Sequence, residues 1–69
     1  MSRIRRMNAD EAEKILQRYG FKLILQKGSH RKWRNQEQQL QVIVPYHENR
    51  DLPLGTLRNI FISADIPTT

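Results

Sequence analysis

The chain has 69 residues, of which 38% are hydrophobic, so it has room for one small domain only. This length excludes dinucleotide-binding folds and barrels, and the absence of cysteine excludes disulfides and thiolate metal sites. Twelve Lys and Arg residues against seven Asp and Glu give a net charge of +5, which favours a phosphate-rich partner.

A first helix is predicted over residues 9–19. The Asn8 side chain is suited to cap its start, and Glu11 stands three positions later, as in a capping box. Gly20 follows the helix where a left-handed residue commonly ends one. The predicted apolar stripe consists of Ala12, Ile15, Leu16 and Tyr19.

Three strands are predicted next, because apolar residues alternate with polar ones. They cover residues 21–26, 29–34 and 40–44. Lys27-Gly28 provides the first turn, residues 35–39 form a polar loop, and Pro45 stops the third strand. Short connections of this kind predict an antiparallel meander.

A second helix is predicted from the region of Pro53, which suits a first-turn position, to a point before Pro67. Its expected apolar face consists of Leu54, Leu57, Ile60, Phe61 and Ala64. The order α-β-β-β-α predicts an α+β fold in which two helices cover one face of a three-stranded antiparallel sheet. The other face is expected to be open to solvent.

Residues 1–69 are expected to form one domain, with a basic leader at 1–7 and a core at 8–66. The leader is not followed by an apolar segment, and the longest apolar runs have three residues. We therefore expect a cytoplasmic protein without a membrane partner.

The two faces of the sheet follow from alternation along the strands, and a slip of one residue would exchange them. The predicted core residues are Phe21, Leu23, Leu25, Trp33, Val42 and Val44. The predicted open face then holds Lys22, Ile24, Gln26, His30, Lys32, Arg34, Gln41 and Ile43. Residues 22–34 contain five cations and no acid, so this face is expected to bind a polyanion.

His30 is the candidate catalyst, because an imidazole exchanges a proton near neutral pH. Cleavage of RNA needs a base for the 2′-hydroxyl and cations for the phosphorane. The alternative is an ordinary surface histidine. Ser29 is not expected to act with His30, because successive strand residues point to opposite faces. His30 and His47 lack a third ligand at a suitable spacing, so no metal or cofactor is expected.

Four blocks of the sequence resemble the HicA family of mRNA interferase toxins. They are Gly20-Phe21, Gln26-Lys27-Gly28-Ser29-His30, Val44-Pro45-Tyr46-His47 and Gly55-Thr56-Leu57-Arg58-Asn59-Ile60. The resemblance covers residues 8–66 and implies a fold like that of double-stranded-RNA-binding domains (dsRBD-like). It also implies ribosome-independent RNA cleavage with His30 as the catalytic residue, and inhibition by a HicB antitoxin. The chain departs from the family in its longer leader and in residues 35–39, which lack the usual aspartate-glycine turn.

The leading hypothesis is an endoribonuclease toxin of a type II toxin–antitoxin system that cleaves mRNA, with His30 as general acid or base. The expected RNA-binding residues are Lys22, Lys27, Ser29, Lys32, Arg34 and His47. The expected antitoxin contacts are Ile24, Ile43, Lys32 and Arg34. The alternatives are a non-catalytic RNA-binding module of the same fold, or a toxin-derived protein that only binds its partner. No small-molecule ligand is expected.

Overall fold

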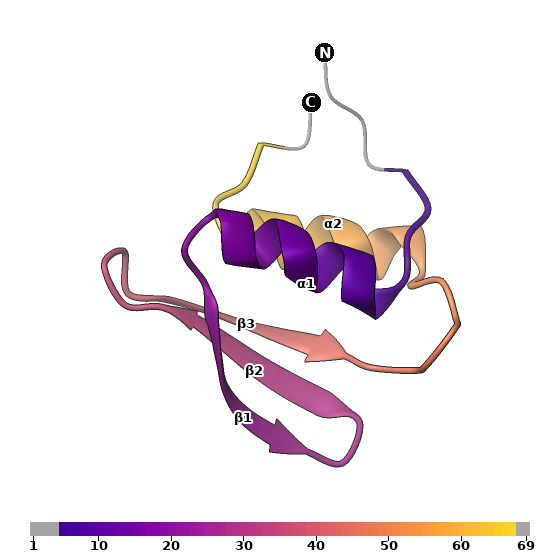
Figure 1. Cartoon of the computed structure of the whole chain (residues 1–69). Helices are drawn as coiled ribbons and strands as arrows, with labels where there is room; N and C mark the ends of the chain where they lie inside the picture. The colour runs from indigo at the N-terminus through magenta and orange to yellow at the C-terminus, as the bar shows by residue number, and fades with distance from the viewer. Residues whose placement is uncertain (1–4, 68–69) are drawn as a thin grey trace.

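The computed structural model describes residues 5–67 and contains five elements in the predicted order. They are α1 (Ala9–Arg18), β1 (Lys22–Lys27), β2 (His30–Asn35), β3 (Leu40–Pro45) and α2 (Leu54–Ser63). The strands form an antiparallel sheet in the order β1-β2-β3, and both helices lie on one side of it (Figure 1). The predicted dsRBD-like α+β fold is confirmed. Among the described residues, no helix is long and apolar enough to cross a membrane.

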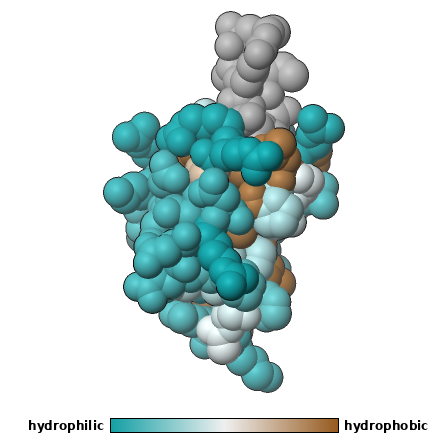
Figure 2. All heavy atoms as spheres, turned by 90° about the vertical axis from the view of Figure 1, so that its right-hand side faces the viewer, coloured by the Kyte–Doolittle hydropathy of each residue, from teal (hydrophilic) through white to brown (hydrophobic). Residues whose placement is uncertain are grey.

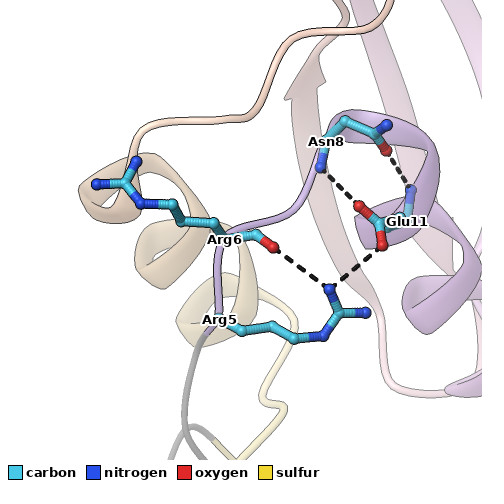
Figure 3. A network of polar contacts seen from close by, with 4 residues as sticks. All are labelled: Arg5, Arg6, Asn8 and Glu11. Carbon is cyan, nitrogen blue, oxygen red and sulfur yellow. Dashed lines mark hydrogen bonds and ion pairs between the residues drawn. The ribbon is translucent and has the colours of Figure 1, made fainter.

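Helix α1 begins with the predicted capping box. The Glu11 backbone N–H donates to Asn8 Oδ1 at 2.9 Å, and the Asn8 N–H donates to Glu11 Oε1 at 3.1 Å. Arg5 donates to Glu11 Oε2 at 3.2 Å and to the Arg6 carbonyl at 3.3 Å, so the preceding segment is tied to the first turn (Figure 3). The hydrogen bond from Asn8 holds the pKa of the Glu11 carboxyl below its ordinary value.

Both helices end in a left-handed residue. After α1, Gly20 has a φ of +91°, as predicted, and the Phe21 N–H donates back to the Leu16 carbonyl at 3.0 Å. After α2, Asp65 takes the same position with a φ of +56°, and the Ile66 N–H donates back into the last turn of the helix. At the C-terminus of α2 the left-handed conformation therefore has a steric cost, because Asp65 has a side chain and glycine would not.

The core lies between the two helices and the inner face of the sheet. Its buried residues are Met7, Ala9, Ala12, Leu16, Phe21, Trp33, Val42, Val44, Leu52, Leu57, Ile60, Phe61, Ala64 and Ile66. Met7 was expected to belong to the leader, but it is 4% exposed, and its carbonyl accepts from the Leu52 N–H at 2.9 Å. The four residues before Arg5 in that leader lie outside the described part of the chain.

Two predicted helix-face residues lie at helix ends and are about half exposed. Tyr19 is the C-cap of α1 rather than a residue of its stripe, and its exposed fraction is 48%. Pro53 is the N-cap of α2 rather than a first-turn residue, so Leu54 becomes the first helical residue and remains 46% exposed. The predictions were wrong here because each helix is shorter than its periodic pattern.

Strand β1 departs most from the predicted core. Leu23 and Leu25 are 42% and 53% exposed, and all six residues of the strand are exposed. The helices cover β3 and the adjoining part of β2, whereas β1 is the strand farthest from them (Figure 1). The prediction failed because alternation within a strand does not show where the helices lie over the sheet, and here they lie over β3 and part of β2.

A bulge in β1 also changes which side chains share a face. Leu23 pairs with Trp33, but the next register pair is Leu25 with Lys32, so Ile24 is an extra residue in the ladder. Beyond the bulge, each residue of β1 points to the face opposite to the one predicted by regular alternation. Leu25 therefore lies on the open face, where Gln26 was predicted, and Gln26 lies opposite Arg31 on the helix side.

Candidate functional site

The open face is built from three rows of residues that lie opposite one another across the strands. The rows are Lys27–His30–Pro45, Leu25–Lys32–Ile43 and Lys22–Arg34–Gln41. Neighbours within a row have Cα atoms about 4.5–5.5 Å apart. Successive residues on one face of a strand are about 6.7 Å apart. The face therefore places the imidazole of His30 near four cationic side chains. These are Lys22, Lys27, Lys32 and Arg34.

His30 is fixed at the first position of β2 by a tight hairpin. Gly28 and Ser29 form the two-residue turn, and Gly28 has a φ of +59°, which is typical of a type II′ turn. The Ser29 carbonyl accepts from the Tyr46 N–H at 2.6 Å, which ties the turn to the segment after β3. The backbone under His30 is thus held on both sides, while its side chain is exposed.

The bulge brings a lysine to the side of His30. In a regular strand Lys27 would share the face of Leu23, toward the helices. The extra residue at Ile24 reverses the alternation, so Lys27 lies directly opposite His30 in the last pair of the hairpin. Lys32 follows on the same face of β2, so His30 has an ammonium group on each of two sides.

The strands that form this face contain no acidic residue. A phosphate group at His30 would therefore meet attractive charge from Lys27 and Lys32 on the two strands. An exposed imidazole beside two ammonium groups is suited to proton transfer at a phosphodiester. Among residues 5–67, no three His, Asp or Glu side chains come together as a metal site would require.

Aliphatic side chains surround the central cation of the face. Ile24 and Leu25 together oppose Lys32 on one side, and Ile43 opposes it on the other. These three side chains are 50%, 53% and 54% exposed. An aliphatic patch of this kind beside cations is typical of a protein-binding surface. We call Ile24, Leu25 and Ile43 the aliphatic patch.

At the other end of the face, Lys22 and Arg34 lie opposite each other beside a hollow of about 190 Å³. Ile24 also lines this hollow, together with loop residues after β2 that include the acid Glu37. Two cations at one depression can hold a second phosphate, two rows away from His30. The face therefore has basic groups at both ends and the aliphatic patch between them.

The chain matches the family model described as the HicA toxin of bacterial toxin–antitoxin systems over residues 9–66. The chain belongs to the HicA family. Comparison with curated proteins and with solved structures finds no match for it. The matched segment contains all three rows of the open face, so this surface lies entirely within the HicA domain.

Most of the predicted site residues of this HicA-family chain share the open face. These are Lys22, Ile24, Lys27, His30, Lys32, Arg34 and Ile43. Ser29 lies in the turn beside His30 rather than in β2, and His47 lies two residues beyond the end of β3. Leu25 was missed as a surface residue, because alternation without a bulge places it in the core.

A buried ionic network on the helix side of the sheet was also missed. Glu13 is 4% exposed, and its carboxylate accepts from Arg31 Nη1 at 2.7 Å and from Trp33 Nε1 at 2.8 Å. The Arg31 guanidinium also lies 3.8 Å from the centre of the Tyr46 ring. The pKa of the Tyr46 hydroxyl is raised, mainly by partial burial and secondly by the negative charge of the neighbouring Asp10. These contacts fix β2 against α1.

A signal for this network was present in the sequence. Glu13 lies four residues after Ala9 and three before Leu16, which places it on the buried side of α1. An acid at a core position of a helix, with an arginine and a tryptophan nearby in the fold, predicts such a buried pair.

Proposed function

We infer that this chain is an endoribonuclease toxin in which His30 acts as general acid or base on mRNA. The observation that carries this proposal is the row that places Lys27 directly opposite His30, with Lys32 next along the same face. The family supplies the toxin–antitoxin context. The proposal adds the nuclease activity and the role of His30.

The proposed chemistry requires only groups that this face contains. The imidazole of His30 takes the proton of the RNA 2′-hydroxyl as the 2′-oxygen attacks the neighbouring phosphorus. Negative charge then develops on the phosphorane oxygens, where the ammonium groups of Lys27 and Lys32 stabilise it. As the phosphorane collapses, the bond from phosphorus to the 5′-oxygen breaks, and the leaving 5′-oxygen takes a proton from solvent water. Lys22 and Arg34 hold a second phosphate of the same strand, while Ser29 and His47 border the reacting end.

The proposed antitoxin of the HicB type binds the same face. Its acidic groups meet Lys32 and Arg34, and its apolar side chains cover the aliphatic patch, including the predicted contacts Ile24 and Ile43. Leu25 joins these two isoleucines because of the bulge. Binding here would exclude RNA from His30 by occupying its surface.

Substitution of His30 by alanine tests catalysis against RNA binding alone. Because the side chain is exposed, His30→Ala is expected to change the free energy of unfolding by at most about 0.5 kcal/mol. RNA binding should persist, since every cation remains. The rate of cleavage of a single-stranded oligoribonucleotide should fall by about a hundredfold or more.

Gln17→Ala is the control, because Gln17 is also an exposed polar residue but lies on α1, on the other side of the sheet. Its cleavage rate should stay within about tenfold of wild type, below the usual loss for a general acid or base. Undiminished cleavage by His30→Ala would remove His30 as the catalyst. Binding without cleavage by the wild-type protein would instead favour the non-catalytic RNA-binding module.

A further inference from the structure

Strand β3 is the last strand of the sheet, and no residue in the described part of the chain pairs with its outer edge. The Tyr46 N–H donates to the Ser29 carbonyl, which sets the alternation of backbone bonds between β2 and β3. Val42 and Val44 then direct their backbone groups toward β2. Gln41 and Ile43 direct theirs away from the sheet, so two N–H groups and two carbonyls face outward.

The two edges of the sheet differ in how they discourage pairing with another chain. On β1, Lys22 and Lys27 stand at the ends and the bulge at Ile24 interrupts the edge. Strand β3 contains no charged residue, and its register with β2 is continuous over six residues. An uncharged, regular edge of this kind favours the addition of another strand.

A groove runs between the outer edge of β3 and α2. It has a volume of about 290 Å³, and its floor includes Gln41 and Ile43. Its wall on α2 presents Thr56, Asn59 and Ser63, which recur at intervals of three and four residues along one side of the helix. These uncharged side chains offer hydrogen bonds to an extended backbone.

The charges next to this edge indicate the chemistry of the occupant. Lys32 lies opposite Ile43, and Arg34 lies opposite Gln41, while the three strands contain no acid. A second copy of this chain would bring another charge of +5 to a positive surface. An acidic chain would be attracted to the same place.

We propose that β3 accepts an extended, acidic segment of the antitoxin as a fourth strand of the sheet. This inference rests on the proposed toxin–antitoxin function. The added strand bonds to the outward backbone groups of Gln41 and Ile43, and its carboxylates on the open face are attracted to Lys32 and Arg34, which lie one strand further in. It therefore extends the antitoxin contact from the open face to the edge of the sheet.

Amide hydrogen exchange in the free chain and in its complex with the purified antitoxin tests this edge directly. The amides of Gln41 and Ile43 should exchange freely in the free chain and at least about tenfold more slowly in the complex. A tight complex in which both amides still exchange at the free rate overturns the edge proposal but leaves toxin–antitoxin pairing intact. Absence of any complex overturns both.

A pair of variants separates the backbone from the side chain. Gln41→Pro removes the outward N–H without breaking the ladder to β2, whereas Gln41→Ala keeps that N–H and removes only the side chain. Gln41→Pro should bind the antitoxin at least about tenfold more weakly than Gln41→Ala. Equal affinity of the two folded variants overturns the proposal, and so does a stable dimer of the chain alone that protects the same amides.

Discussion

The two faces of strand β2 have opposite properties, although their residues alternate along one six-residue segment. On the helix side, every side chain hydrogen bonds to α1 or its cap. These residues are Arg31, Trp33 and Asn35. On the open side, the side chains form no such bond among residues 5–67. These residues are His30, Lys32 and Arg34.

The helix-side residues of β2 therefore attach the strand to α1, whereas the open-side residues are available to bind a ligand. Asn35 illustrates this attachment. Its side-chain amide donates to the Tyr19 carbonyl at 2.9 Å, and its side-chain oxygen accepts from the Gln38 N–H at 3.0 Å. In the view of Figure 2 most of the surface is formed by hydrophilic residues, and hydrophobic residues show mainly toward its right-hand side. Basic side chains on the open face, which form no such hydrogen bond in the described part of the chain, are available for the proposed contacts with RNA or with a partner.

The largest effect on stability is expected from Trp33→Ala, which tests the helix side of β2. It removes a buried aromatic side chain and one donor to Glu13, so the free energy of unfolding should fall by about 3–5 kcal/mol. Urea unfolding measures this loss. Lys32→Ala, the neighbouring position on the open side, should change stability by about 0.5 kcal/mol or less. Similar losses for both variants would contradict the separation of faces.

The next effect concerns partner binding. Replacing both Ile24 and Ile43 by serine should weaken the antitoxin complex at least about tenfold, because it removes two exposed apolar contacts. Leu23→Ser is the matched control, since Leu23 is also an exposed aliphatic residue but belongs to the helix side of β1. Titration calorimetry at equal folded concentration provides the comparison. A collapse of stability in the double variant with unchanged affinity would mean that the faces are inverted.

The smallest expected effect is on the salt dependence of RNA binding. Three or four engaged cations predict a slope of log affinity against log salt of about −2 to −3 for a single strand. Arg34→Gln should reduce the magnitude of this slope by about 0.7. Arg31→Gln removes the same charge from the opposite face, so it should leave the slope unchanged and lower the stability. A flat titration for the wild type would exclude the basic face from RNA binding.

Local signals explain why most of the fold was predictable. The capping box at Asn8 and Glu11, the glycine after α1 and the polar loop before β3 each act over a few residues, so the order of elements follows from the sequence. The open positions of His30, Lys32 and Arg34 also follow, because β2 is regular and Trp33 fixes its buried side.

The remaining features depend on contacts that a single segment does not encode. The alternation of Phe21, Leu23 and Leu25 is the same with or without a bulge, and only pairing with β2 shows that Ile24 is extra. Coverage of β1 depends on helix length and placement. The loop after β2 closes with Gln39 at a φ of +56°, a conformation that glycine adopts more readily.

The bulge has a further consequence for how the surface can vary. If Ile24 were deleted, Leu23 and Leu25 would still oppose Trp33 and Lys32, now as consecutive pairs of a regular ladder. No other residue of β1 would change sides, and Lys27 would remain opposite His30. Insertion or deletion at this one position would therefore alter the shape of the proposed partner-binding surface while the proposed reacting row stays constant. If the proposed function holds, recognition of an antitoxin can diverge here through chain length as well as residue type, while the row that contains His30 is kept.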